Sequence, residues 1–258
     1  MPQTAALPPV PALVPLSPDL VGSTGRESVE RLVGAVRRAL PRVNVLDPQD
    51  IPVPGTAATE GHDGARPAIP SVLRLVDRLG VPSVLMPLTL SSFYAGGQLA
   101  APAARARYEA RVAQPLGPDR LLARALLVRL RQAGAQWGDA VVLAAGELSG
   151  PAALAAAEHA AAMLASEWGS PVSLASTSPL APSVQDAVSD LRATGAHRVF
   201  VASYLLTPGP LADVVAGSAR QAGAAGVAEV LAGHRLLVEL IVQRYRTVLA
   251  SWGQGGPV

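Results

Sequence analysis

Two similar stretches of sequence, one in each half of the chain, constrain the fold most strongly. Residues 84–97 read VLMPLTLSSFYAGG, an apolar run of strand-forming residues that ends in Ser91, Ser92 and a loop of small residues. Residues 200–211, FVASYLLTPGPL, repeat this pattern 116 residues later. In open α/β sheets, a buried strand that runs into a small polar loop carries the ligand site at that end. The pair therefore predicts two similar halves with a cleft between them.

A second match supports the duplication. Residues 116–122, LGPDRLL, align with residues 231–237, LAGHRLL, at an offset of 115. Two independent segments at nearly the same offset favour an internal repeat. We place the boundary near residues 134–138, which gives an N-terminal half over 12–134 and a C-terminal half over 139–252.

The order of apolar runs and helical periodicities predicts the α/β class, with parallel sheets flanked by helices. Pro- and Gly-rich residues 48–67 interrupt this order and form a long loop, either a lid or an insertion. Asp119 and Ser149 are the expected caps of the helices that follow them. The expected strands are 12–15, 43–46, 81–90, 139–145, 172–175, 198–206 and 226–231, and the expected helices are 26–40, 68–79, 100–112, 119–133, 151–168, 183–193, 210–222 and 235–251.

Composition excludes several kinds of chemistry. The 258 residues include no Cys, which excludes disulfides, Cys-ligated zinc and iron–sulfur clusters. All 21 basic residues are Arg, which excludes Schiff-base and P-loop lysines. A net charge of +2 and few aromatic residues argue against nucleic acid. The longest uncharged run, 79–104, contains three prolines, so we expect no membrane span and a cytoplasmic protein. A homo-oligomer is left open.

Five segments in their order resemble the sirohydrochlorin cobaltochelatase and ferrochelatase family, the CbiX/SirB-like class II tetrapyrrole chelatases. The resemblance spans residues 12–246 and implies two α/β halves around a cleft that holds a tetrapyrrole such as sirohydrochlorin. It implies insertion of Co²⁺ or Fe²⁺, as substrate, in cobalamin or siroheme biosynthesis. The segments are VPSVLMPLTLSSFY at 81–94, PLGPDRLLARAL at 115–126, AVVLAAGELSGPAALA at 140–155, ATGAHRVFVASYLLTPG at 193–209 and RYRTVLA at 244–250.

The sequence departs from this family at its two imidazoles. The resemblance implies one His at the end of the first strand and another in the loop after residues 81–90, which serve as metal ligand and base. Pro15 and Ala95 stand at these positions, and Leu16 replaces the glycine after the first. Because neither Pro nor Ala binds metal or accepts a proton, we expect impaired or altered metal insertion. The alternative is a catalytically inactive member that binds a tetrapyrrole or supports a partner.

Two residues are candidate substitutes for the missing imidazoles. Glu147 follows the first strand of the C-terminal half and is a candidate base or ligand, or else a solvated carboxylate. His62 lies in the sequence Glu-Gly-His-Asp within the long loop, as a candidate base or an ordinary loop residue. The other histidines, His159, His197 and His234, are interpreted as helix, strand-edge and helix-start residues.

Substrate binding is predicted at the polar residues around the two strand ends. Arg105 is placed to pair with carboxylates of the macrocycle, unless it belongs to a solvated helix face. The hydroxyl-bearing candidates are hydrogen-bond partners of the same carboxylates, or else ordinary loop polarity: Ser17, Ser91, Ser92 and Tyr94. A small-molecule binding domain unrelated to tetrapyrroles is the remaining alternative.

Overall fold

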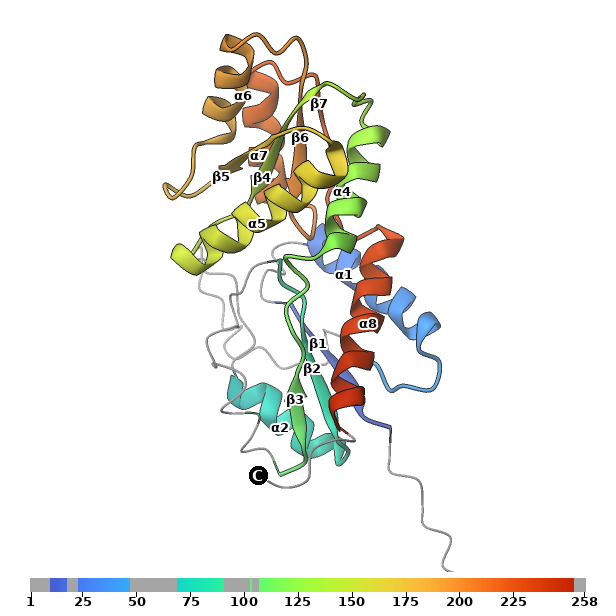
Figure 1. Cartoon of the computed structure of the whole chain (residues 1–258). Helices are drawn as coiled ribbons and strands as arrows, with labels where there is room; N and C mark the ends of the chain where they lie inside the picture. The colour runs from blue at the N-terminus through green and yellow to red at the C-terminus, as the bar shows by residue number, and fades with distance from the viewer. Residues whose placement is uncertain (1–9, 18–22, 47–68, 91–102, 104–106, 253–258) are drawn as a thin grey trace, which may run out of the picture.

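Two parallel β-sheets with flanking helices form the protein, as the α/β prediction requires (Figure 1). The computed structural model describes residues 10–17, 23–46, 69–90, 103 and 107–252. The N-terminal sheet has the strand order β1-β2-β3 and the C-terminal sheet the order β5-β4-β6-β7. The strands are β1 (Ala12–Leu16), β2 (Ser83–Pro87), β3 (Ala110–Val112), β4 (Ala140–Ala145), β5 (Val172–Ser176), β6 (Val199–Tyr204) and β7 (Gly226–Val227).

The helices follow the predicted periodicities closely. In the first helix, Val29, Leu32, Val33 and Val36 fall on one stripe, and all four are buried. Among the described helices, none is long and apolar enough to cross a membrane. The helices are α1 (Ser23–Ala39), α2 (Ile69–Leu79), α4 (Arg120–Gln132), α5 (Pro151–Trp168), α6 (Val184–Ala193), α7 (Pro210–Gln221) and α8 (Arg235–Trp252).

The C-terminal sheet has helices on both faces because its central strands β4 and β6 are apolar except for Ser203 and Tyr204 at the end of β6. Alternate residues point to opposite faces of a strand. Val141 and Leu143 of β4 pack in one cluster with residues of α4 and α5. Val142 and Ala144 pack in another cluster with residues of α6 and α7. The sheet is therefore buried on both sides, and its polar groups gather at the strand ends.

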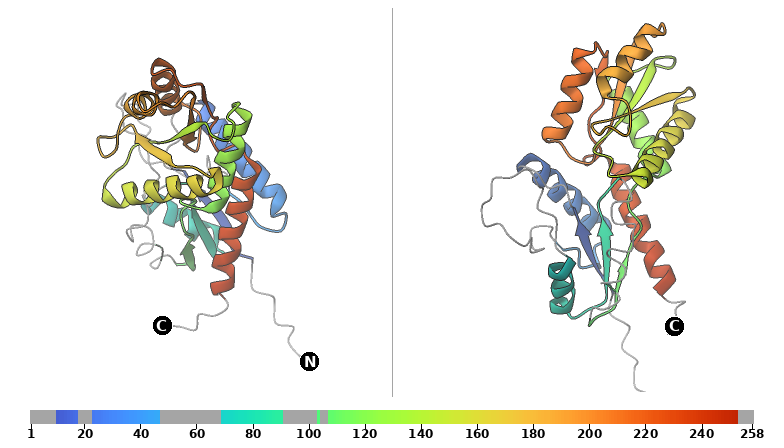
Figure 2. Two further views of the ribbon diagram at one scale, coloured as in Figure 1. Left: turned by 45° about the horizontal axis from the view of Figure 1, so that its top comes forward. Right: turned by 90° about the vertical axis from the view of Figure 1, so that its left-hand side faces the viewer.

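The last helix of each half packs on the other half. Helix α4 packs against α5 and β6, and α8 packs against α1 and β2. The chain thus crosses between the halves twice, at residues 113–119 and 228–234. Figure 2 shows α8 alongside the N-terminal sheet. The division into residues 12–134 and 139–252 stays a prediction about folding units, and these two helices pack across it.

Backbone hydrogen bonds repeat at the offset seen in the sequence. The N–H of Leu116 donates to the carbonyl of Thr89 at 3.0 Å. The N–H of Leu231 donates to the carbonyl of Leu205, also at 3.0 Å. Each bond joins a crossing segment to the residues just beyond a central strand, β2 in the N-terminal sheet and β6 in the C-terminal sheet. The two halves therefore share their geometry at the point where the chain passes between them.

Two predicted elements are wrong. Residues 110–112, expected at the end of a helix, form strand β3, because pairing with β2 overrides the helix-favouring composition of Ala and Arg. Residues 43–46, expected as a strand, make only an isolated bridge from Val45 to Leu13. At this edge of β1, the backbone of Leu13 donates one hydrogen bond and accepts another. Pro15 has the next backbone nitrogen facing the same edge and has no N–H to continue the ladder.

Several element ends also differ from prediction. Helix α1 begins at Ser23, three residues earlier than expected, and β7 ends at Val227 rather than at residue 231. Helix α5 has Gly150 as its N-cap residue, without a side-chain cap, so the cap predicted at Ser149 is wrong. The predicted cap at Asp119 is confirmed. The predicted loop 48–67 lies outside the described residues.

Candidate functional site

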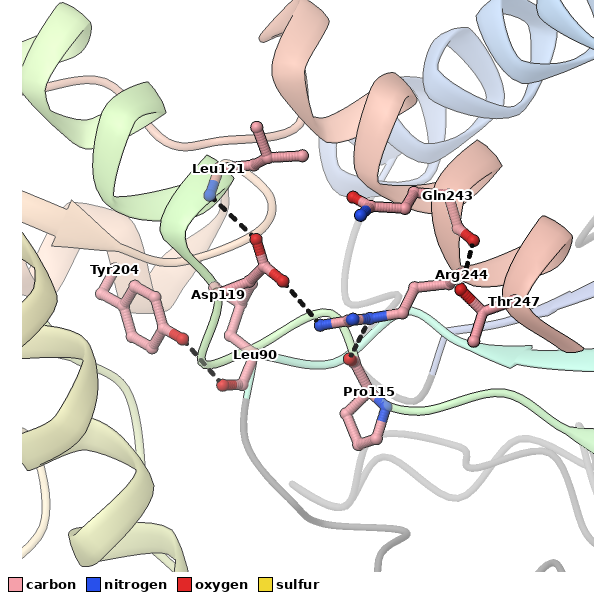
Figure 3. Close-up of polar contacts among 8 residues, drawn as sticks. All are labelled: Leu90, Pro115, Asp119, Leu121, Tyr204, Gln243, Arg244 and Thr247. Atoms are coloured by element: carbon pink, nitrogen blue, oxygen red, sulfur yellow. Dashed lines mark hydrogen bonds and ion pairs between the residues drawn. The ribbon is translucent and has the colours of Figure 1, made fainter.

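The carboxyl ends of the two sheets face each other, and one side-chain hydrogen bond joins them. Tyr204 is the last residue of β6, and Leu90 follows β2 by three residues. The Tyr204 hydroxyl donates to the Leu90 carbonyl at 2.9 Å (Figure 3). In parallel sheets, ligands bind beyond the carboxyl ends of the strands. This contact lies where the two strand ends meet, and a ligand site between the halves stays a prediction.

The first position expected to hold an imidazole lies inside a strand. Pro15 is the fourth of the five residues of β1, pairs with Met86, and is buried. The next residue, Leu16, is 1% exposed and packs in the core cluster that includes Val14 and Leu85. Both side chains are therefore part of the folded core rather than of a polar strand end. The second position, Ala95, lies outside the described residues.

The remaining candidates have different environments. Ser17 directly follows β1 and is 5% exposed. Glu147 lies two residues beyond β4 and is exposed. These two residues follow the first strands of the two sheets, as predicted. The other candidates lie outside the described residues: His62, Ser91, Ser92, Tyr94 and Arg105.

The histidines of the described segments are separate from one another. His159 is exposed on α5, and His197 is exposed just before β6. His234 is buried, and its Nδ1 accepts a hydrogen bond from the Leu236 N–H at 3.2 Å. Burial, followed by the charges of neighbouring arginines, lowers the pKa of His234 below its usual value. Within the described segments, no three His, Asp or Glu side chains are grouped as metal ligands.

A charged pair fixes the first crossing segment near the Tyr204 contact. Asp119 accepts from the Leu121 N–H at 2.8 Å and thus caps α4. Its other oxygen accepts from Arg244 of α8, also at 2.8 Å. Arg244 additionally donates to the carbonyl of Pro115 at 3.3 Å. Figure 3 shows this group beside Tyr204. The start of α4 and the middle of α8 are therefore tied together where the halves meet.

A groove of about 600 Å³ lies on the C-terminal half, between the loop after β5 and the side of α7. Several of its polar side chains already have hydrogen-bond partners within the protein. The Ser176 hydroxyl donates to the Gly146 carbonyl at 3.0 Å, and the Ser183 hydroxyl donates to Asp186 at 2.6 Å. The groove has no basic residue in its lining, so it does not suit a polycarboxylate. Its lining is Ser176, Thr177, Ser178, Pro179, Ala181, Pro182, Ser183, Val184, Asp186, Val214, Val215 and Ser218.

Tyr204 and Gly117 were not predicted as site residues, although the internal repeat contains the signal. At an offset of 116, Tyr204 corresponds to the apolar Leu88, so this position of the repeat has a phenol hydroxyl in the C-terminal half and none in the N-terminal half. At an offset of 115, Gly117 corresponds to Ala232. The two differing residues meet in space, because a Cβ atom at Gly117 would contact the Tyr204 hydroxyl. Such paired departures from an internal repeat indicate a local role that the fold itself does not require.

Comparison with known proteins identifies the fold. The CbiX family model matches residues 140–248. SirB from Bacillus subtilis with Fe³⁺ has a TM-score of 0.69 at 15% identity, covering 94% of this chain and 97% of SirB. SirB from B. subtilis subspecies spizizenii in complex with cobalt has a TM-score of 0.66, also at 15% identity and with the same coverage.

A third solved structure agrees. CbiX, described as the terminal enzyme of siroheme biosynthesis in denitrifying bacteria, has a TM-score of 0.61 at 20% identity, covering 92% of this chain and 99% of CbiX. No curated protein sequence matches the chain. Residues 140–248 therefore match the CbiX family by sequence, and the chain as a whole has the fold of the sirohydrochlorin chelatases, which confirms the predicted resemblance.

Proposed function

We propose that this protein binds a sirohydrochlorin-type tetrapyrrole between the carboxyl ends of its two sheets and that its metal-insertion chemistry is altered. The observation that carries the proposal is the CbiX match over residues 140–248, which includes the ends of both β4 and β6. These strand ends form the C-terminal side of the proposed site. The structural likeness over 94% of the chain supports a matching N-terminal side.

Metal insertion requires that two pyrrole N–H protons leave while a divalent metal ion is delivered to the ring. A neutral imidazole suits both tasks, whereas Pro15 suits neither. Glu147 is exposed just beyond β4, where a carboxylate is able to accept a proton from a bound ring. We assign it as the substitute base, together with His62. Co²⁺ or Fe²⁺ is the metal substrate in this proposal.

The macrocycle carries many carboxylates, and these need hydrogen-bond donors. We propose that Ser17, which directly follows β1, donates to one of them. Arg105 is proposed to form a charge-assisted pair with another. Ser91, Ser92 and Tyr94 complete the proposed set of donors beyond β2.

A second candidate function is a catalytically inactive protein that binds a tetrapyrrole or supports an active partner. The burial of Pro15 within β1 favours it, because the position expected to hold an imidazole is closed inside a sheet. This candidate differs from the first in chemistry and not in ligand. One titration therefore separates the two.

The experiment is anaerobic absorbance spectroscopy of the protein with sirohydrochlorin, first without metal and then after addition of Co²⁺ or Fe²⁺. A metal-dependent spectral change faster than the protein-free reaction supports altered chelation. A saturable shift without a gain in rate supports the inactive binder. If neither occurs, the tetrapyrrole proposal is wrong.

Glu147→Gln tests the assigned base. Its control is Glu158→Gln, which changes an exposed carboxylate on α5. We expect the first variant to lower the insertion rate about tenfold or more and to leave the metal-free shift unchanged. The second should alter neither. Equal rates in the two variants would contradict the assignment of Glu147.

A further inference from the structure

The hydrogen bond between Tyr204 and Leu90 joins parts of the chain that are 114 residues apart. Tyr204 is 5% exposed, so its hydroxyl needs a partner within the protein. The partner belongs to the other half of the molecule. In the repeat, Leu88 takes the place of Tyr204 and has no polar atom. The hydroxyl is therefore an addition to the duplicated fold and not a part of it.

Gly117 provides the space for this contact. A Cβ atom at Gly117 would lie 2.1 Å from the Tyr204 hydroxyl oxygen and 2.3 Å from the Leu90 carbonyl oxygen. Gly117 is not among the glycines with positive φ, so space and not backbone conformation requires glycine here. Ala232 stands at the equivalent position of the other half, where the equivalent of Tyr204 is Leu88. Gly117 thus leaves the space that the Tyr204 hydroxyl occupies, and the two residues depend on each other.

The contact is also insensitive to pH. Burial, followed by the negative charge of Asp119, raises the pKa of Tyr204 far above its usual value. The phenol therefore stays protonated and remains a donor around neutral pH. Arg244 and the N–H of Leu121 in turn hold Asp119 in place. The carboxylate whose charge acts on Tyr204 is therefore held in place by residues of both α4 and α8.

We infer that Tyr204 is a positioning residue that sets the distance between the carboxyl ends of β2 and β6, and through it the geometry of the ligand site between the halves. The consequence for ligand binding rests on the proposed function. A site that is held in its binding geometry before the ligand arrives loses less freedom on binding. Removal of the hydroxyl should leave both sheets intact and loosen their relative position.

The test variant is Tyr204→Phe, and Tyr245→Phe is its matched control. Tyr245 is also a buried tyrosine whose hydroxyl donates to a backbone carbonyl, that of Pro11, at 2.6 Å. That bond ties α8 to the start of β1 and not to a strand end at the proposed site. Both variants lose one hydrogen bond of the same type. A purely structural role would therefore give the same results for both.

Two readouts separate the inference from the proposed function. Because the chain has no Cys, Arg78→Cys on α2 and Asp190→Cys on α6 introduce the only two labelling sites, both exposed and one in each half. Electron paramagnetic resonance of attached nitroxides then gives the distance distribution between the halves. The dissociation constant for metal-free sirohydrochlorin comes from the absorbance titration.

We expect Tyr204→Phe to broaden or shift the distance distribution and to raise the sirohydrochlorin dissociation constant about tenfold, against about twofold or less for Tyr245→Phe. An unchanged distribution in Tyr204→Phe overturns the inference, whatever the affinity. A changed distribution with an unchanged affinity overturns its consequence for the site. If the wild-type protein does not bind sirohydrochlorin, the proposed function fails, and the distances alone still decide the positioning role.

Discussion

Asp119 and His234, which lie 115 residues apart, hold the first turns of two equivalent helices in the same way. Oδ1 of Asp119 accepts from the Leu121 N–H at 2.8 Å, and Nδ1 of His234 accepts from the Leu236 N–H at 3.2 Å. The internal repeat therefore extends to the helix caps. The chemistry differs, because a carboxylate accepts over a wide pH range, whereas an imidazole accepts only while Nδ1 is unprotonated.

The free energy of unfolding should fall as the pH is lowered from about 7.5 to about 5.5, in part through His234. Burial and the charges of Arg129 and Arg235 lower its pKa in the folded state. The unfolded chain therefore takes up the proton more readily, so this contribution is complete above the unfolded pKa and is lost as the pH falls through the folded one. Urea unfolding at several pH values measures it.

His234→Asn isolates the effect, because an Asn oxygen still accepts from the helix N–H groups but does not titrate. We expect this variant to lose less stability than the wild type over the same pH range. His159→Asn, an exposed change on α5, should leave the pH dependence as it is. A pH profile of His234→Asn identical to that of the wild type would contradict the prediction.

Asp119 has two roles that two substitutions separate. Asp119→Asn keeps an acceptor for the Leu121 N–H but removes the charge that faces Arg244, and should cost about 1 kcal/mol. Asp119→Ala removes both the cap and the ion pair, and should cost about 2–3 kcal/mol. Denaturant unfolding at neutral pH measures both changes.

The control for Asp119 is Ser183→Ala. Ser183 caps α6 through the Asp186 N–H at 3.1 Å and faces no ion pair between the halves. Its loss should cost about 1 kcal/mol, as for an ordinary N-cap. If Asp119→Ala costs no more than Ser183→Ala, then the pair with Arg244 contributes nothing measurable.

The sequence predicted the parts of the fold that depend on local patterns. Helix α5 has the predicted bounds of 151–168, since Pro151 and the Ala-rich stretch favour a helix at any tertiary position. Strand β3 was missed because its three residues owe their conformation to pairing with β2. The packing of α4 and α8 on opposite halves was also missed, because an internal repeat shows that two helices are equivalent but not which sheet each one covers.

The candidate site was predicted less completely. Ser17 and Glu147 do follow the first strands of the two sheets, and their part in a site stays a prediction. Tyr204 was missed because its hydroxyl acts on a carbonyl of the other half, 114 residues away. No local pattern encodes that distance. The signal in the sequence is that the two halves of the repeat differ at Tyr204 and Leu88 and at Gly117 and Ala232.

Gly117→Ala should destabilise the protein by about 2–4 kcal/mol, because the added Cβ meets two oxygen atoms well inside van der Waals distance. The matched control is Gly217→Ala on α7, where nothing lies within 4 Å of the added atom. That change should be neutral or stabilising by about 0.5–1 kcal/mol, since Ala favours a helix interior over Gly. Thermal or urea unfolding compares the two, and equal effects would contradict the crowding at Gly117.

Pro15→Ala should extend the pairing of β1 with the segment that contains Val45. At this edge, Leu13 donates to the Asn44 carbonyl and accepts from the Leu46 N–H, each at 2.9 Å. In a parallel ladder the next donor on β1 is residue 15, and its next acceptor is the carbonyl of Leu46. Proline has no hydrogen to donate, so the ladder ends at a single bridge.

The measurement for Pro15→Ala is amide hydrogen exchange at position 15, with the N–H of Leu13 as the internal reference. We expect protection of the new N–H to approach that of Leu13. The free energy of unfolding should change by less than about 1 kcal/mol, because the added hydrogen bond offsets the greater freedom of the unfolded chain. Exchange at the rate of an unprotected amide would show that the sequence of residues 43–46, and not the missing N–H of Pro15, prevents a fourth strand in the N-terminal sheet.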